Sequence, residues 1–335
     1  MIKGPIMSWF KNMTAKELLQ YVGDIKQIAG ATSSILNDGP GFNSRICEVN
    51  TAAGLSFTVL PDRGMDISAC RYKGIPIAPI SKVGIRNPES VNNSGYEFLK
   101  NFHCGLLTTC GLTHIGPPSA INGLHGPFSN LRTENFSINE FWDDDDYIIQ
   151  LKGKIRQAVF FSENIQLQRT ITTSLKSSSF TITDTITNQA FRHENIQLLY
   201  HINFGYPLLS PDTTIKLPTV TTLPRDEVAD KGLAHFLDVL PPQAIFDEQV
   251  YFHRPKPEKK CRFRVENKTI GIALDCQYDS TELPYLTQWN QFGQNEYVLG
   301  IEPGLGWPMN KPEGGLILAP LESFTTSLHF DLSNI

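Results

Sequence analysis

His201 stands in a run of the sequence that otherwise predicts a buried strand. It follows "IQLLY" and precedes "INFGYPLL", where a glycine and a proline break the pattern. Such a histidine is a hydrogen-bonded core residue, a metal ligand or a general acid facing a substrate, and the run alone leaves these interpretations open. Its place near the end of a predicted strand favours a site, because functional residues gather where strands give way to loops.

Glu302 ends a second apolar strand, in the stretch "YVLGIEPGLGWP". A carboxylate at the end of a buried strand is costly unless it is paired or used. Partial burial would raise its pKa above the usual value of about 4.3, toward that of a useful base. The alternative is a structural carboxylate that caps the following loop.

Two further histidines, His114 and His125, each lie beside a glycine after an apolar strand. They occur in "CGLLTTCGLTHIGPP" and "NGLHGPFSNL". A histidine next to glycine can approach a ligand with little steric screening. Either one alone could be structural, but two within one short loop system favour a binding site.

Arg63 and Trp289 complete the candidate set. Arg63, in "LPDRGMDI", can hold hydroxyls or a carboxylate with its planar guanidinium, or form an internal ion pair with Asp62 or Asp66. Trp289, in "YLTQWNQFG", offers a flat surface for the apolar face of a sugar, although a core or edge position is an equal alternative.

Composition narrows the class of protein. The chain has 335 residues, of which 40% are hydrophobic and 19% charged, which indicates a sizeable core rather than disorder. The net charge of -5, without a Lys/Arg stripe, argues against nucleic acid as a partner. The sequence has no CxxC pair, no long apolar run and no nucleotide-binding or HExxH motif. We therefore expect a cytoplasmic protein with reduced cysteines, no membrane span, no cofactor and no bound metal.

Alternation with period two dominates the chain and predicts an all-β fold. "ENIQLQRTITTSL" and "FTITDTITN", separated by "KSSS", form a hairpin signature rich in β-branched residues. Turn residues separate many such strands, and no linker divides the chain. We therefore predict one domain over residues 1–335, built as an antiparallel sandwich.

Helix signals are few. Thr14 and Glu17 form a capping box that predicts a short helix over about 14–22. Residues 94–102 and 225–237 are further candidates. The acidic run 143–146 is interpreted as a solvated hairpin tip, with calcium binding as the alternative.

At these residues the chain resembles the galactose mutarotase-like superfamily, and within it a branch of aldose 1-epimerase-related proteins catalogued as a domain of unknown function. The resemblance covers nearly the whole chain and is carried by "GLSFTVLPDRGMDI", "GLLTTCGLTHIG", "GLHGPFSNL", "LLYHINFGYPLL", "LPRDEVADKGL", "DEQVYFH" and "YVLGIEP". It implies a β-supersandwich of antiparallel sheets with a few short helices.

The resemblance also implies roles. His201 takes the place of the general acid, although Asn203 before Phe204 departs from the order in the classical enzymes. Glu302, in "GIEP", takes that of the general base, and His125, in "LHG", that of a sugar-binding histidine. Arg63 matches a binding arginine loosely.

The remaining matches are weaker. The aspartate that holds sugar hydroxyls has no clean match; Asp247 is the first choice and Asp226 the second, which leaves the choice of sugar open. His114 belongs to the branch and not to the classical enzymes, which points to a different ligand.

The implied function is an aldose 1-epimerase-like isomerase that acts on a small carbohydrate. In the implied mechanism, Glu302 is the carboxylate that takes the anomeric proton and His201 the imidazolium that protonates the ring oxygen. A sugar-binding protein without catalysis is one alternative. A metal-dependent sugar isomerase or epimerase, with a metal held by histidines and a carboxylate, is another. A homodimer is possible.

Overall fold

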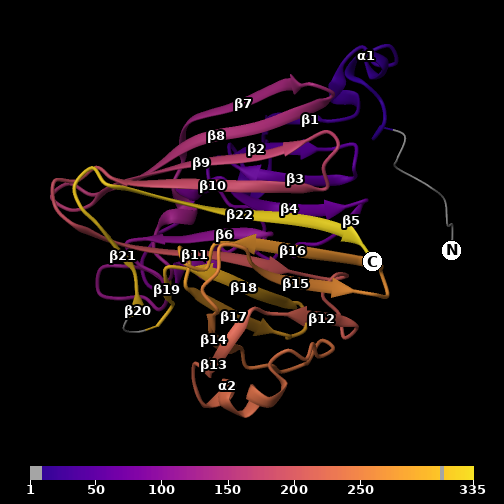
Figure 1. Cartoon of the computed structure of the whole chain (residues 1–335). Helices are drawn as coiled ribbons and strands as arrows, with labels where there is room; N and C mark the ends of the chain where they lie inside the picture. Colours follow the sequence, from indigo (N-terminus) through magenta and orange to yellow (C-terminus); the bar gives the residue numbers. More distant parts are fainter. Residues whose placement is uncertain (1–9, 310–312) are drawn as a thin grey trace.

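Two large antiparallel sheets lie face to face in the computed structural model (Figure 1), which describes residues 10–309 and 313–335. The order of strands in the first sheet is β1 (Gly30–Ile35), β2 (Arg45–Asn50), β3 (Leu55–Leu60), β4 (Asp66–Tyr72), β6 (Leu107–Leu112), β11 (Glu194–Phe204), β18 (Val298–Gly304), β17 (Tyr285–Gln291), β14 (Gln249–Pro255) and β13 (Thr219–Pro224). Strand β5 (Ile75–Pro76) pairs with β4, and β21 (Leu316–Leu318) pairs with β11.

The second sheet contains the long hairpins expected from the alternating threonine-rich sequence. Its order is β12 (Thr213–Lys216), β15 (Cys261–Asn267), β16 (Ile272–Tyr278), β22 (Ser323–Asn334), β10 (Ser179–Asn188), β9 (Asn164–Ser174), β8 (Asp146–Ala158) and β7 (Thr133–Asp143). The hairpin predicted over "ENIQLQRTITTSL" and "FTITDTITN" is β9 and β10, which pair antiparallel. A separate ribbon pairs β19 (Gly306–Trp307) with β20 (Glu313–Gly314). The all-β sandwich prediction is confirmed.

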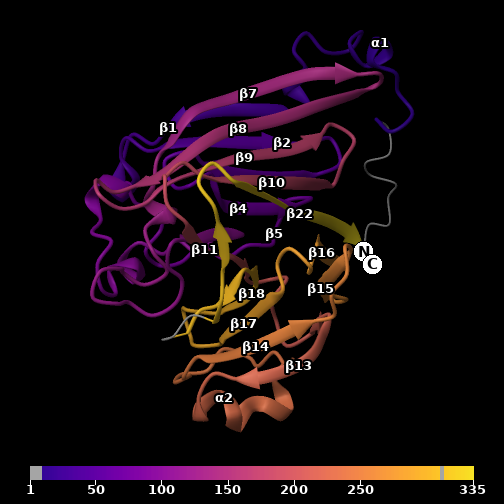
Figure 2. The same cartoon turned by 60° about the vertical axis from the view of Figure 1, so that its left-hand side comes forward.

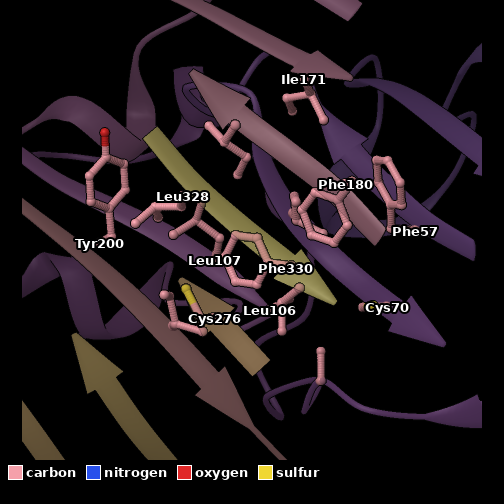
Figure 3. Packing of buried hydrophobic residues seen from close by; sticks show 14 of the residues in the cluster. Phe57, Cys70, Leu106, Leu107, Ile171, Phe180, Tyr200, Cys276, Leu328 and Phe330 are labelled. Atoms are coloured by element: carbon pink, nitrogen blue, oxygen red, sulfur yellow. The ribbon is translucent and has the colours of Figure 1, made fainter. Parts of the chain in front are cut away.

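Aromatic side chains hold the two sheets together. The ring of Phe180 on β10 stacks on Phe57 of the first sheet at a centroid distance of 4.8 Å, and on Phe330 of its own sheet at 4.7 Å. Figure 3 shows these rings among the buried residues between the sheets. All six cysteines are buried with free thiols, as expected for core residues.

The predicted helices are present but short. Helix α1 (Ala15–Leu18) begins with the predicted capping box of Thr14 and Glu17. Its continuation to residue 21 is held by i→i−3 hydrogen bonds, so the α-helical part ends earlier than predicted. Helix α2 (Glu227–Gly232) continues into a 3₁₀ turn at Leu233–His235. In Figure 2, α2 lies beside β13 and β14.

Other short elements are 3₁₀ turns. They span Ile25–Gln27, Gly39–Gly41, Pro88–Ser90, Glu97–Lys100 and Phe128–Asn130. The helix predicted within residues 94–102 is the 3₁₀ turn at Glu97–Lys100. The acidic run is the tip of the β7–β8 hairpin, as interpreted, and Asp145 there accepts a hydrogen bond from the main-chain N–H of Ala15. Within the described residues, no helix has the length and apolar character needed to cross a bilayer.

Candidate active site

Strand β11 presents two chemically different faces. Tyr200 points between the sheets, where its hydroxyl donates to Asp184 Oδ2 of the opposite sheet at 2.7 Å. Successive side chains of a strand point to opposite faces. His201 therefore faces away from the core, into a cavity on the outer side of the first sheet.

His201 and Glu302 lie opposite each other on adjacent strands. The pairs Ile202–Ile301 and Leu199–Gly304 set the register of β11 against β18. His201 Nε2 and Glu302 Oε1 are 3.3 Å apart, and the two residues are only 5% and 2% exposed. Glu302 Oε1 has no aligned hydrogen-bond partner within the described residues. A buried carboxyl oxygen left in this condition is costly, which favours a functional role over a structural one.

The pKa shifts of this pair oppose the charge states that the family resemblance implies. Burial raises the pKa of Glu302 well above its usual value, and the negative charge of Glu248 adds to the shift. Burial also lowers the pKa of His201 to about 4, against a smaller upward shift from the hydrogen bond with Asn203. Removal from water disfavours whichever form is charged. Both shifts favour a carboxylic acid and a neutral imidazole over the carboxylate and imidazolium that the resemblance implies.

The cavity in front of the pair has a volume of about 790 Å³, within the range of small-molecule sites, roughly 300–1,000 Å³. Aromatic and aliphatic side chains form most of its wall, with a few polar groups between them. The lining residues other than His201 and Glu302 are Tyr96, Phe98, Leu99, Phe102, Gly116, Pro117, Leu124, His125, Arg225, Asp226, Glu248, Val250, Thr287, Trp289, Pro308 and Met309. Trp289 and His125 are therefore in the cavity, as predicted.

His125 is held as a hydrogen-bond donor toward the cavity. Its backbone lies in the left-handed region at φ 60°, which is uncommon for a residue with a side chain. Its Nδ1 accepts from the main-chain N–H of Gly116 at 3.3 Å, so a neutral ring carries its hydrogen on Nε2. Burial lowers the pKa of His125 to about 3, with smaller contributions from His201 and His114, and keeps it neutral.

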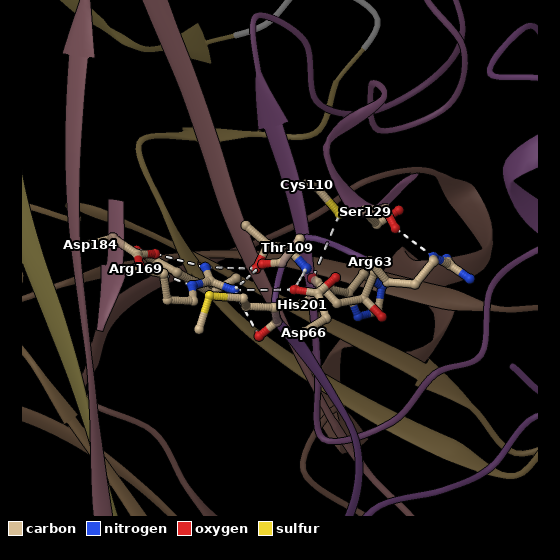
Figure 4. A network of polar contacts seen from close by, with 12 residues as sticks. Arg63, Asp66, Thr109, Cys110, Ser129, Arg169, Asp184 and His201 are labelled. Carbon is tan, nitrogen blue, oxygen red and sulfur yellow. Dashed lines mark hydrogen bonds and ion pairs between the residues drawn. The ribbon is translucent and has the colours of Figure 1, made fainter. Parts of the chain in front are cut away.

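Arg63 and His114 lie outside the cavity, which corrects two expectations. Arg63 is 1% exposed, and Figure 4 shows its guanidinium directed at the carbonyl of Ser129. It also bonds the side chain and carbonyl of Asn101. His114 Nε2 contacts the carbonyl of Pro117 at 2.7 Å. Both side chains organise the loops that surround the cavity.

The first choice for a hydroxyl-binding carboxylate, Asp247, lies outside the cavity. Asp247 is exposed and does not line the cavity, whereas its neighbour Glu248 does. Val250 also lines the cavity, and residues two apart share a face of an extended chain. This alternation in the sequence could have predicted that Glu248, and not Asp247, faces the cavity. Asp226, the second choice, lines the cavity and also caps α2 by accepting from the N–H of Ala229.

A polar chain crosses the cavity wall from Asp226 to Trp289. Arg225 Nε donates to Asp226 Oδ2 at 2.8 Å, and its Nη1 donates to Glu248 Oε1 at 2.8 Å. The other oxygen of Glu248 accepts from the indole N–H of Trp289, also at 2.8 Å. Two carboxylates therefore share one guanidinium. Arg225 is not among the residues predicted from the sequence, although it stands beside Asp226.

No group of three or more His, Cys, Asp and Glu side chains in residues 10–309 and 313–335 is arranged to hold a metal ion. The three histidines do not all face the cavity. His114 bonds the carbonyl of Pro117, while His125 and His201 face the cavity with ring centroids 5.9 Å apart.

Comparison with solved structures places this geometry in a known fold. A candidate aldose 1-epimerase from Klebsiella pneumoniae is 25% identical, with 96% of this chain and 86% of that chain covered and a TM-score of 0.85. A galactose mutarotase-like protein from Clostridium acetobutylicum is 15% identical, with 92% and 100% covered and a TM-score of 0.67. A galactose 1-epimerase from Lactobacillus acidophilus is 12% identical, with 91% and 99% covered and a TM-score of 0.63.

The fold is therefore galactose mutarotase-like, as the resemblance implied. No curated protein matches the chain. One family profile matches residues 42–330, and it is described as Domain of unknown function (DUF4432). Since this match spans most of the sequence, the chain belongs to that family.

Proposed function

We propose that the protein interconverts the anomers of a cyclic sugar by general acid–base catalysis at His201 and Glu302. The observation that carries this proposal is the facing pair itself. Its Nε2 and Oε1 atoms are 3.3 Å apart at the bottom of a cavity, and the carboxyl oxygen has no other partner in the described structure. Two groups that share one proton can give and take it on either side of a hemiacetal.

The reaction balances with that single proton. One group takes the proton of the anomeric hydroxyl while the other gives a proton to the ring oxygen. The ring C–O bond breaks with its electrons going to the ring oxygen, and C1 becomes an aldehyde. After rotation about C1–C2, the two groups reverse their roles, the ring closes on the other face, and both return to their initial states. Each positioned acid or base typically contributes on the order of 10²–10⁴-fold.

Other cavity residues support binding of a sugar. Trp289 lies beside the pair, with its ring centroid 5.3 Å from that of His201, and offers an aromatic face to the C–H side of a pyranose. His125 directs an N–H toward the cavity, and Glu248 and Asp226 offer acceptors for hydroxyls.

Charge favours a neutral sugar. Arg225 is the one Lys or Arg among the described lining residues, and both of its ion-pair partners, Asp226 and Glu248, are carboxylates of the same wall. A sugar phosphate or uronic acid would bring a further negative charge to a wall that already has more carboxylates than cations. We therefore expect neutral aldoses to react faster than their anionic derivatives.

The test is an NMR exchange experiment on aldoses, ketoses, uronic acids and sugar phosphates. We expect magnetisation to pass between the α and β anomers of at least one neutral aldose faster with the protein than without it. Glu302→Gln and His201→Asn should each remove that acceleration. If the variants still bind sugar while the parent accelerates no exchange, the protein is a sugar-binding module. Activity retained in either variant would remove that residue from the mechanism.

A further inference from the structure

Asn203 makes hydrogen bonds that fix the direction of its side-chain amide. It follows His201 by two residues on β11 and is fully buried. Its Nδ2 donates to the carbonyl of His201 at 3.1 Å and to the carbonyl of Cys104 at 3.3 Å. Carbonyl oxygens only accept, so the opposite orientation would place the amide oxygen against two other oxygens. The amide oxygen must therefore face the imidazole.

That oxygen determines which nitrogen of His201 carries a hydrogen. Asn203 Oδ1 lies 2.7 Å from His201 Nδ1. The amide oxygen is an acceptor, so Nδ1 must be the donor. A neutral imidazole has one N–H, which leaves a lone pair on Nε2, the nitrogen that faces Glu302 Oε1 at 3.3 Å.

Aromatic neighbours restrain the ring in this orientation. The ring centroid of His201 lies 5.2 Å from that of Phe102, 5.3 Å from that of Trp289 and 5.9 Å from that of His125. A turn of the imidazole would break the contact with Asn203 and disturb this packing. The side chain is therefore held with Nδ1 toward Asn203 and Nε2 toward Glu302.

We propose that Asn203 is a positioning residue that holds His201 as the Nδ1–H tautomer, so that Nε2 accepts the first proton of the catalytic cycle and Glu302 donates the other. The hydrogen on Nδ1 follows from the hydrogen bonds of Asn203, whereas the order of proton transfers rests on the proposed function and on a neutral ring. In this order the anomeric O–H gives its proton to Nε2, and the carboxylic acid of Glu302 protonates the ring oxygen. The roles are the reverse of those implied by the family resemblance.

The hydrogen bond with the amide raises the pKa of His201, but it offsets only part of the lowering that burial causes. A carboxylate at the same place would favour the imidazolium form, whereas an amide oxygen fixes the tautomer without adding a charge. This agrees with the pKa of His201, which burial lowers to about 4. A pH–rate profile cannot separate the two orders of transfer, because the pair holds one proton in both. A spectroscopic measurement can.

The experiment is ¹⁵N NMR of the His201 ring in the full-length protein without ligand, assigned with His201→Gln. We expect Nδ1 in the protonated, pyrrole-like range and Nε2 in the unprotonated range at neutral pH. The opposite pattern, or an imidazolium, would overturn the proposal. This readout requires no sugar, so it is independent of whether anomer exchange is found.

Two nearly isosteric variants sharpen the test. Asn203→Leu, which cannot accept, should shift the ring toward the Nε2–H tautomer and lower kcat on the order of 10²-fold. Asn203→Asp keeps the acceptor and adds a charge, so it should keep Nδ1–H and raise the titration midpoint of the ring by about one pH unit or more. Asn290→Asp, which buries a carboxylate on β17 away from the imidazole contacts, is the control and should leave the ring unchanged.

An unchanged tautomer in Asn203→Leu, or an unchanged midpoint in Asn203→Asp, would contradict the positioning role. If Asn203→Leu does not fold, the parent spectrum and the aspartate variant still decide the question.

Discussion

The two faces of β11 hold two buried polar clusters that differ in how their charges are compensated. On the inner face, the hydroxyl of Tyr200 donates to Asp184. Arg169 lies between Asp184 and Asp66 (Figure 4) and also donates to the carbonyl of Gly64. These four side chains form the inner cluster. On the outer face, His201 and Glu302 form the outer pair and face each other without an aligned hydrogen bond. Glu302 Oε1 has no hydrogen-bond partner among the described residues.

The pKa values follow the same contrast. Burial alone would lower the pKa of Arg169, but Asp184 and Asp66 outweigh it and raise that pKa. Asp66 is the least compensated member of the inner cluster: its Oδ2 has no hydrogen-bond partner among the described residues, and burial raises its pKa to about 7. No cation in the outer pair offsets burial, so Glu302 and His201 are both shifted toward their neutral forms. Buried ions that are paired indicate a structural cluster, whereas buried titratable groups that face a cavity without a counter-charge indicate a site for proton transfer.

The largest expected effect is on the inner face. Arg169→Met removes the cation between two buried carboxylates and should lower the free energy of unfolding by about 3–5 kcal/mol. Chemical denaturation measures this value. Lys82→Met, which breaks the exposed pair with Glu296, is the control and should change stability by less than about 1 kcal/mol. If both variants lose the same free energy of unfolding, the cluster around Arg169 is not a special source of stability.

The second prediction concerns Gly300→Ala, a substitution that crowds the outer pair and leaves both of its side chains in place. A Cβ on Gly300 would lie 2.6 Å from Glu302 Oε1 and 3.3 Å from His201 Cε1. Gly300→Ala should therefore displace the carboxyl group and slow anomer exchange on the order of 10²-fold, as expected for a small misplacement of a catalytic group. Gly23→Ala, where a Cβ meets nothing within 4 Å, should leave the rate unchanged. An unaffected rate in Gly300→Ala would mean that the carboxyl position is unimportant.

The third prediction is a bell-shaped pH–rate profile. The active pair holds one proton. The pKa of His201, about 4, sets the acid limb. At lower pH the pair gains a second proton and has no base left. The raised pKa of Glu302 sets the alkaline limb. At higher pH the pair loses the proton that it must donate. The rate should fall about tenfold per pH unit beyond each limb. Glu302→Gln has no carboxyl group to titrate, so its residual activity should lack the alkaline limb. If the pH profile of this variant still falls at high pH, another group causes that limb.

The smallest effect distinguishes two neighbouring carboxylates. Glu248→Gln should weaken the contacts with Arg225 and Trp289 and reduce kcat/KM by about fivefold, equivalent to roughly 1 kcal/mol. Asp247→Asn, outside the cavity, should leave kcat/KM unchanged. The reverse outcome would restore Asp247 as the hydroxyl-binding residue.

The sequence predicted the architecture better than the details of the site. Strict alternation in β9 and β10 identified an antiparallel hairpin, and apolar runs ending at glycine or proline identified His201 and Glu302. These signals are local, so one sequence reveals them. The direction of Arg63 depends on the carbonyls of Ser129 and Asn101, which lie far along the chain, and no local pattern reports it.

The protonation states were also inaccessible from residue types. Burial removes His201 and Glu302 from water without supplying a counter-charge, and only the assembled cavity reveals this. Asp247 and Glu248 are neighbours in an extended segment, where a shift of one residue moves a side chain to the opposite face, so residue type alone did not show which of them lines the cavity.

If the outer pair serves the reaction and the inner cluster serves stability, neutralising one carboxylate in each should have opposite effects. The test is to measure the exchange rate and the unfolding free energy together on Glu302→Gln and Asp184→Asn. We predict that Glu302→Gln loses exchange by about 10²–10⁴-fold while its stability stays within about 1 kcal/mol of the parent. Asp184→Asn should lose about 3–5 kcal/mol of stability but keep exchange wherever it is folded. If Glu302→Gln unfolds as readily as Asp184→Asn and exchanges sugar as fast as the parent, the division between the two faces of β11 is wrong.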